Sequence, residues 1–218
     1  MNKTEAASHT GVAVAGGSLF VIAAPSGAGK TSLVRALLER EPGIRLSVSY
    51  TTRPPRPGEI DGVHYRFVDQ HRFDACRDAN EFLEYAHVHG NWYATSATWL
   101  ASEVGAGHEV LLEIDWQGAA QVRRLIPGAV LIFILPPSLE SLRERLEKRG
   151  QDTPEVIARR IEAAREEMRH CGDFDYVIIN QDFATAADDL AAIVRASRLR
   201  VAPQQAHHAA LLETLLAP

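Results

Sequence analysis

Residues 18–31 read SLFVIAAPSGAGKT, and the pattern of their side chains changes twice. The apolar run over 18–24 has the length of a strand that is buried on both faces, and the residues after it include proline and two glycines. From Lys30 onward, apolar side chains recur at the spacing of one helix face, at Leu33, Val34 and Leu37. The stretch therefore predicts a strand, a glycine loop and a helix, which is a building unit of α/β folds.

The loop of this unit, APSGAGKT over residues 24–31, matches the phosphate-loop pattern G-x-x-x-x-G-K-[ST], except that Ala24 replaces the first glycine. Gly27 and Gly29 allow the backbone to turn so that successive N–H groups point at one anion, which also meets the positive end of the helix dipole. Lys30 brings a positive charge to the outer phosphates, and the Thr31 hydroxyl can bind Mg²⁺. The loop predicts a site for a nucleoside triphosphate. A glycine turn that binds nothing is the alternative.

Strands and helices alternate along most of the remaining chain. Apolar runs at 110–114, 129–135 and 176–179 predict buried strands, and helical patterns cover 117–125, 138–149, 154–169, 183–201 and 203–217. This alternation indicates a mainly parallel sheet flanked by helices and joined by right-handed crossovers. The predicted fold class is therefore α/β.

Two segments depart from the alternation. Residues 46–100 are richer in aromatic and polar residues, and their short strand-like pieces LSVSYTT, HYRFV, FLEYAHV and NWYAT predict an inserted subdomain with a small antiparallel sheet. Residues 140–165 are highly charged and are interrupted by Gly150, which is typical of a mobile helical lid. The small and polar residues 1–17 are expected to form a disordered tail. We expect the rest of the chain, residues 18–218, to form one domain. Its core is expected to comprise 18–45, 101–139 and 166–218.

A second acidic element follows the predicted strand Val110-Leu-Leu-Glu113-Ile-Asp115. In open α/β sheets, ligands bind at the carboxyl ends of the strands, and Glu113 and Asp115 lie at such an end. Because they are two residues apart, they are expected on one face of the strand. Either one or both could hold Mg²⁺ through water or contact a second substrate. The alternative is that Asp115 only caps the following helix.

The composition narrows the possible functions. A net charge of −5 argues against a general nucleic-acid binder, and no apolar run approaches the ~20 residues that span a bilayer. The N-terminus lacks the continuous apolar region of a signal peptide. Cys76 and Cys171 lie far apart, which indicates free thiols in a reducing compartment rather than a disulfide or a zinc site. We expect a cytoplasmic protein without nucleic-acid or membrane partners.

Residues 51–59, TTRPPRPGE, combine two arginines with three prolines. They could be an extended peptide for the aromatic groove of a partner, or they could hold two guanidinium groups around an anion bound by this chain. Polyproline geometry has about three residues per turn, so Arg53 and Arg56 would share one side. The segment lies between two strand-like pieces of the inserted subdomain, and this favours the anion site.

Several stretches occur in a fixed order that resembles the guanylate kinase family: APSGAGKTSL, SVSYTTRPPRPGEIDGVHYRFV, EFLEYAHVHGNWYATS, LLEIDWQGA and FILPPSLESLRERLEKRG. The resemblance covers residues 18–200 and is far more specific than a phosphate loop alone. It implies ATP-dependent phosphorylation of GMP, and of dGMP as well, with Mg²⁺ as the cofactor. The sequence leaves open whether the chain forms a homo-oligomer.

The resemblance also implies roles for the positions that match the family motifs. Residues expected to bind ATP are Ser26, Gly27, Ala28, Gly29, Lys30, Thr31 and Ser32; those expected to bind GMP are Ser49, Arg53, Arg56, Tyr65, Glu84, Tyr93, Thr95 and Asp115; and those expected to act on the transferring phosphoryl group are Lys30, Arg145, Arg149 and Arg160.

These roles agree with the chemistry of the side chains. The guanidinium groups of Arg53 and Arg56, with two tyrosine hydroxyls, supply donors for a phosphate that is nearly a dianion. Glu84 can accept both the N1–H and the 2-amino group of guanine, whereas the N1 lone pair of adenine would face the same carboxylate unfavourably. A carboxylate in this position would therefore select guanine.

Two other functions are compatible with parts of the sequence. A kinase for another small molecule could use the same scaffold, although it would not need Glu84. A kinase-like module that only binds peptides would be expected to lack Lys30 or part of the GMP site, and both are present. His207 and His208 are adjacent and point in different directions on a helix, which indicates a surface pair rather than a metal site.

Overall fold

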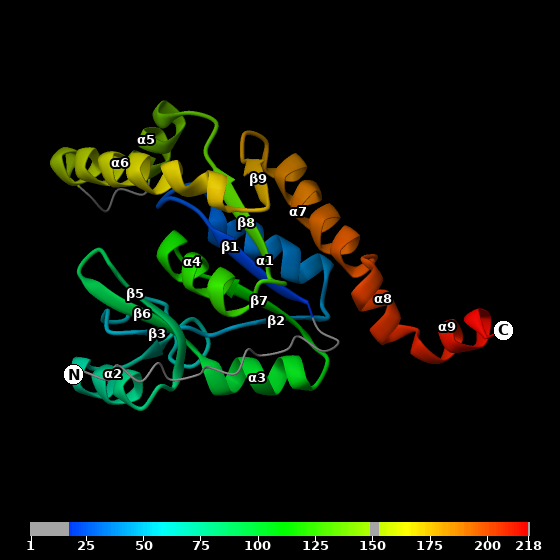
Figure 1. Cartoon of the computed structure of the whole chain (residues 1–218). Coiled ribbons are helices and arrows are strands. Elements are labelled where there is room, and N and C mark those ends of the chain that lie inside the picture. Colours follow the sequence, from blue (N-terminus) through cyan, green and yellow to red (C-terminus); the bar gives the residue numbers. More distant parts are fainter. Residues whose placement is uncertain (1–17, 149–152, 218) are drawn as a thin grey trace, which may run out of the picture.

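A five-stranded parallel sheet forms the centre of the computed structural model, which describes residues 18–148 and 153–217 (Figure 1). The strands lie in the order β2-β7-β1-β8-β9, and all neighbouring pairs are parallel. Their bounds are β1 Leu19–Ala23, β2 Ile44–Leu46, β7 Glu109–Glu113, β8 Val130–Leu135 and β9 Tyr176–Ile179. The predicted α/β class is confirmed. The prediction did not include β2, whose three residues are too short for a clear pattern.

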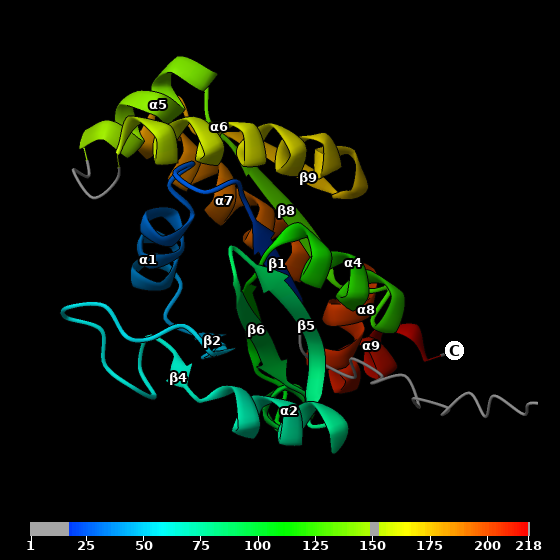
Figure 2. The same ribbon diagram turned by 90° about the vertical axis from the view of Figure 1, so that its left-hand side faces the viewer.

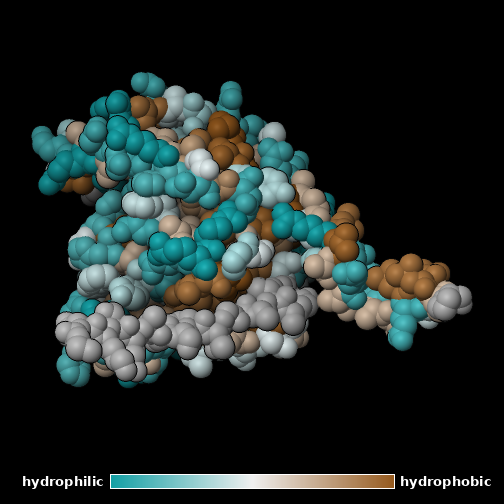
Figure 3. All heavy atoms as spheres, viewed as in Figure 1, coloured by the Kyte–Doolittle hydropathy of each residue, from teal (hydrophilic) through white to brown (hydrophobic). Residues whose placement is uncertain are grey.

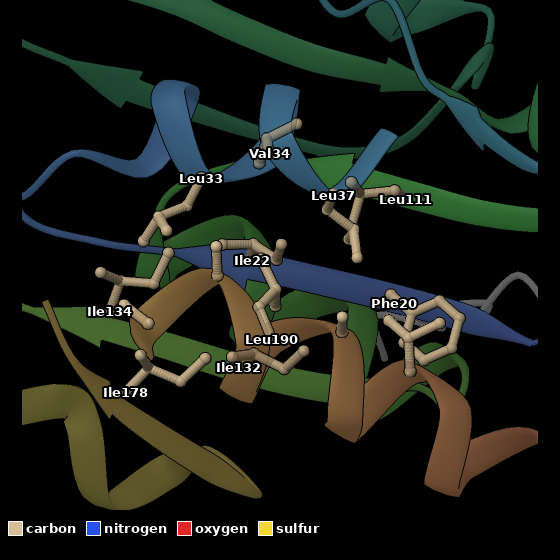
Figure 4. Close-up of a cluster of buried hydrophobic side chains, with 14 of the residues drawn as sticks. Phe20, Ile22, Leu33, Val34, Leu37, Leu111, Ile132, Ile134, Ile178 and Leu190 are labelled. Carbon is tan, nitrogen blue, oxygen red and sulfur yellow. The ribbon is translucent and has the colours of Figure 1, made fainter. Parts of the chain in front are cut away.

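Helices cover both faces of this sheet. One face packs against α1, Lys30–Arg40, and α7, Phe183–Arg198, through a core that includes Phe20, Ile22 and Leu190 (Figure 4). Alternate residues of the same strands, such as Leu19 and Val21, point to the other face, where they meet α3, Ala97–Gly105, and α4, Trp116–Leu125. Burial on both faces explains why β1 is apolar at every position.

A second, four-stranded sheet lies apart from the first (Figures 1 and 2). Its order is β4-β3-β6-β5, with bounds β3 Tyr50–Thr51, β4 Arg66–Phe67, β5 Phe82–Val88 and β6 Asn91–Ser96. The expected antiparallel pairing holds for β3 with β6 and for β5 with β6, but β4 lies parallel to β3. A long excursion over residues 52–65 separates β3 from β4, so no tight hairpin fixes an antiparallel pairing. Helix α2, Gln70–Asp78, packs Phe73 and Cys76 against this sheet.

Two helices lie above the carboxyl ends of the main strands, opposite the small sheet (Figure 2). They are α5, Leu139–Lys148, and α6, Pro154–Met168, and a short 3₁₀ helix over Arg169–Asp173 follows. Leu142 and Leu146 of α5 pack with Ile157 and Ile161 of α6. This pair therefore has a small core of its own.

The C-terminal helices extend away from the body of the protein (Figure 1). One helix was expected over 203–217, but the structure has α8, Val201–His207, and α9, Ala209–Leu216, with non-helical angles at His208. Neither helix contains a buried residue, so no packing enforces a continuous helix across this point. Leu215 and Leu216 are exposed on α9, which forms the brown tip in Figure 3. No helix among the described residues is long and apolar enough to cross a membrane.

Candidate active site

A cavity of about 280 Å³ lies at the carboxyl ends of β1 and β7, between the α5–α6 pair and the small sheet. Of the residues predicted from the sequence, those that line it are Ser26, Gly27, Gly29, Lys30, Thr31, Ser32, Ser49, Arg56, Tyr65, Glu84, Tyr93, Glu113, Asp115 and Arg160. The phosphate loop and the predicted base-reading residue Glu84 therefore border one space. Ala28, Arg53 and Thr95 are not part of this lining but contact residues that are, and Arg145 contacts Ala28 in turn.

The phosphate loop has the backbone that its glycines predict. Gly27 and Gly29 have positive φ angles of 95° and 98°, which L side chains rarely adopt. A β-carbon on Gly29 would also lie 2.5 Å from Nδ2 of Asn180. Asn180 donates from this same nitrogen to the carbonyl of Ala28 at 2.7 Å and holds the loop from behind.

The two polar residues at the end of the loop contact β7 and the residue after it. Lys30 Nζ donates to the carbonyl of Ile114 at 2.8 Å, and the Thr31 hydroxyl donates to Glu113 at 2.6 Å. A hydroxyl beside carboxylates is a hard oxygen donor set of the kind that Mg²⁺ uses together with waters and substrate phosphates. The donor set thus fits the metal that the sequence implies.

Asp115 caps α4, as the alternative reading of its position predicted. Its Oδ1 accepts from the backbone N–H of Gly118 at 2.9 Å, and its Oδ2 accepts from the side chain of Gln117 at 3.0 Å. Asp115 nevertheless borders the cavity. The cap fixes the position of its carboxylate, and it does not prevent a contact with a ligand.

Glu84 is a buried acid with one neutral partner. It is 3% exposed, and its Oε1 accepts from the Thr95 hydroxyl across β5 and β6 at 2.7 Å. Burial raises the pKa of Glu84 to about 7, and nearby Asp115 adds to this shift, whereas Thr95 opposes it. The backbone of Thr95 contributes as well, and because Glu84 borders the cavity, the acid can pair with a ligand there.

The arginines of the TTRPPRPGE segment differ in their surroundings. Arg53 donates to both oxygens of Glu59 at 2.8 and 2.9 Å, and its guanidinium lies over the ring of Tyr65. Glu59 also accepts from the backbone N–H of Arg56 at 2.7 Å, so this one acid holds the segment in a closed turn. Arg56 itself lines the cavity. The segment is folded against its own chain and is not presented as an extended ligand.

Two tyrosines complete this side of the cavity. The rings of Tyr65 and Tyr93 meet edge to face with centroids 6.0 Å apart. Burial raises the pKa of Tyr65 to about 12, with Glu113 contributing, so its hydroxyl remains a donor at neutral pH. Both residues can therefore donate to an anion in the cavity.

The predicted lid arginines occupy different positions. Arg145 donates to the carbonyls of Ala28 and Asn180 at 3.1 and 2.8 Å, so it holds the outside of the phosphate loop. Arg160 borders the cavity and donates to the Ser26 hydroxyl at 2.6 Å. Arg149 lies outside the described residues.

Several residues of this site were not singled out from the sequence. Gly118 leaves room for the Glu84 carboxylate, which lies well within contact distance of the place where a β-carbon would be. Asn180 follows β9 and supports the phosphate loop, Glu59 closes the proline turn, and Glu167 lies at the end of α6. Asn180 meets its partner far away in the sequence, whereas Glu59 pairs with Arg53 only six positions away. Gly118 carried a signal, as a glycine inside a helical pattern.

Comparisons with known proteins agree with this arrangement. The family model described as guanylate kinase matches residues 17–197. A guanylate kinase of Aromatoleum aromaticum is 62% identical over 192 residues, which are 88% of this chain and 94% of that protein. One of Dechloromonas aromatica is 60% identical over 200 residues, which are 92% and 99% of the two chains. The crystal structure of guanylate kinase from Anaplasma phagocytophilum superimposes with a TM-score of 0.76 at 35% identity and covers 92% of this chain and 95% of that one.

Proposed function

Because this chain belongs to the guanylate kinase family, we propose that it transfers the γ-phosphoryl group of ATP to GMP, and also to dGMP, in purine nucleotide metabolism of the cytoplasm. The observation that carries the proposal is the shared cavity, which is bordered by a phosphate loop and by the buried Glu84. A loop of this kind suits the donor nucleotide, and a buried carboxylate suits the guanine of the acceptor.

The phosphate loop and its neighbours would bind ATP. Backbone N–H groups from Ser26 to Ser32 and the charge of Lys30 would hold the β- and γ-phosphates. Thr31 would hold Mg²⁺ directly, and Glu113 and Asp115 would do so through water. The metal ion, when bound, neutralises charge on the phosphate oxygens.

The small sheet and the proline turn would bind GMP. Glu84 would accept from N1–H and the 2-amino group of guanine, with Thr95 and Ser49 beside it. Arg56, Tyr65 and Tyr93 border the cavity and would donate to the GMP phosphate, and Arg53 would join them. Arg53 reaches that phosphate only if it exchanges part of its pairing with Glu59.

Transfer would proceed in line between the two bound nucleotides. The attacking phosphate oxygen is already an anion, so no general base is needed, and the protein contributes position and charge. Lys30 and Arg160 would stabilise the transferring group from the loop and from α6, and Arg149 would assist. The proposed lid over 140–165 and the proposed GMP subdomain over 46–100 would close on the substrates and exclude water, which limits hydrolysis of ATP.

The proposal is tested by ADP release over a panel of nucleoside monophosphates. GMP and dGMP are expected to support turnover with ATP and Mg²⁺, and AMP, CMP and UMP are expected to support almost none. Turnover with a different monophosphate would identify another kinase on the same scaffold. No ADP release with any member of the panel would overturn the proposal.

A further inference from the structure

The edge strand of the small sheet lies beside helix α4 of the main sheet (Figures 1 and 2). β5 is the last strand in the order β4-β3-β6-β5, so within the described residues no strand pairs with its outer edge. Such an edge presents backbone N–H and C=O groups that need other partners. One side chain of α4, that of Gln121, reaches this edge and supplies them.

The carboxamide of Gln121 binds both backbone groups of Tyr85. Its Nε2 donates to the carbonyl of Tyr85 at 2.8 Å, and its Oε1 accepts from the N–H of Tyr85 at a longer distance of 3.4 Å. A carboxamide offers a donor and an acceptor side by side, so it takes the place of a residue in a neighbouring strand. Nε2 also donates to the carbonyl of Gln117 at 3.3 Å, one turn earlier in α4, and this contact fixes the direction of the side chain.

Three successive residues of β5 contact the main part of the protein at this point. Leu83 packs against the core formed by α3, α4 and β7, the Glu84 carboxylate lies against Gly118, and Tyr85 is held by Gln121. Gly118 and Gln121 are three positions apart and therefore share one face of α4. Because consecutive Cα atoms are about 3.8 Å apart, a shift of the Tyr85 backbone carries Glu84 with it.

The pairing of β5 with β6 does not by itself fix the place of Glu84. The register between the two strands shifts between Phe82 and Glu84, which is the mark of a bulge. A bulge changes the direction of the side chains beside it, so a further contact has to set where the acid points. The contacts with α4 supply that constraint.

We propose that Gln121 is a positioning residue for guanine recognition, because it holds the backbone of Tyr85 against α4 and thereby sets the place of the Glu84 carboxylate in the cavity. The inference rests on the proposed function, since it assumes that Glu84 accepts from guanine. The carboxylate has to meet the N1–H and the 2-amino group together, so a small displacement weakens both hydrogen bonds. Gln121 should therefore affect GMP far more than ATP.

The test compares Gln121→Met with wild type in assays with GMP, ATP and inosine monophosphate (IMP). The base of IMP keeps N1–H and lacks the 2-amino group. IMP is measured as a competitor of GMP, so its binding is detected whether or not it is phosphorylated. Methionine is close to glutamine in length and removes both hydrogen bonds. Tyr85 is 40% exposed, so water can replace the carboxamide and the variant is expected to fold.

Gln70→Met is the matched control. Gln70 lies on α2 of the same subdomain, is exposed, and pairs with Asp74 of its own helix. The substitution removes the same carboxamide without touching β5. It should change each measured constant less than about twofold.

We expect Gln121→Met to raise the KM for GMP roughly 10-fold, to leave the KM for ATP within about twofold, and to reduce the preference for GMP over IMP roughly 5-fold. The melting temperature should change little. In a Glu84→Gln background, Gln121→Met should have almost no further effect on the preference, because both substitutions act through one carboxylate.

An unchanged preference for GMP over IMP in Gln121→Met would overturn the inference. Equal losses for GMP and ATP would also overturn it, since they would indicate a general effect on the structure. The same holds for additive effects of Gln121→Met and Glu84→Gln on the preference. If the wild type did not turn over GMP at all, the proposed function itself would be overturned.

Discussion

The carboxylate of Glu84 lies against Gly118, and only the absence of a β-carbon at residue 118 leaves room for it. Gly118 is in the first turn of α4, where its N–H also binds the cap Asp115. Gly118→Ala is therefore expected to displace Glu84 and to raise the KM for GMP by roughly 10-fold or more, with poorer rejection of AMP. Steady-state kinetics with both nucleotides measure the effect.

Gly128→Ala is the matched control for this substitution. A β-carbon on Gly128 meets no atom within 4 Å, and its φ angle is not positive. It should leave the KM for GMP unchanged. If Gly118→Ala also left the KM and the selection against AMP unchanged, the space beside Glu84 would have no role in recognition.

The pKa of Glu84 predicts a pH dependence of GMP binding. In the proposed function the ionised acid would accept the two guanine donors. Burial raises the pKa of Glu84 to about 7, so much of it is protonated below that pH. We expect the KM for GMP to fall by up to about 10-fold between pH 6 and pH 8. The GMP phosphate titrates in the same range. The pH profile of Glu84→Gln contains only the contribution of the GMP phosphate, so it is subtracted from the profile of the wild type. Identical profiles for the two proteins would contradict the prediction.

The raised pKa of Glu84 also affects the stability of the fold. Rising pH should favour GMP binding but lower stability. Because the folded pKa is above the ordinary value of 4.5, the contribution of Glu84 to stability is fully present below that value and is lost as pH rises through about 7. Glu84→Gln should therefore gain stability relative to wild type at pH 8, on the order of 1–3 kcal/mol, and less at pH 5. Urea unfolding at both values measures this difference, and an equal difference at the two pH values would count against a buried, titrating acid.

The sequence predicted the parts of this molecule that depend on local patterns. The apolar run of β1, the glycine loop and α1 follow from residue type and periodicity over 18–40, and the structure confirms them. Strand β2 and the parallel pairing of β4 were missed because each is short and is defined by its neighbour in space. Helix α2 was missed because its segment was read by its aromatic and polar composition.

The sequence predicted the parts of the candidate site that lie within contiguous motifs. It predicted less well the contacts between residues that lie far apart in the chain. Glu59 pairs with Arg53 within the quoted segment TTRPPRPGE, yet the two arginines alone were considered for an anion. Asn180 reaches Ala28 from 152 positions away, a contact that no local pattern contains. The resemblance assigns Arg145 to the phosphoryl group, whereas the structure shows it holding the phosphate loop from outside.

Lys30 is expected to be required for transfer more than for GMP binding. It lies in the phosphate loop, and its Nζ is held at the Ile114 carbonyl, on the side of the cavity formed by β7. Lys30→Ala should reduce kcat by at least ~10²-fold, because a charge that stabilises the transferring group is lost. Calorimetry should still detect GMP. A variant with nearly normal turnover would show that Lys30 has another role.

Substitutions of Arg160 and Arg145 should have different effects. We expect Arg160 to act in the site and Arg145 to support the phosphate loop. Arg160 faces the cavity, so Arg160→Met is expected to lower kcat by roughly 10²-fold with little change in melting temperature. Arg145 donates to two backbone carbonyls, and in Arg145→Met the carbonyl of Asn180 would lose this donor. The cost of an unpaired buried acceptor is about 1–3 kcal/mol, so this variant should melt several degrees lower. Its kcat should recover partly in glycerol or at low temperature, where the loop is more rigid, and that of Arg160→Met should not. Equal melting temperatures for Arg145→Met and Arg160→Met would show that the contacts of Arg145 do not stabilise the loop.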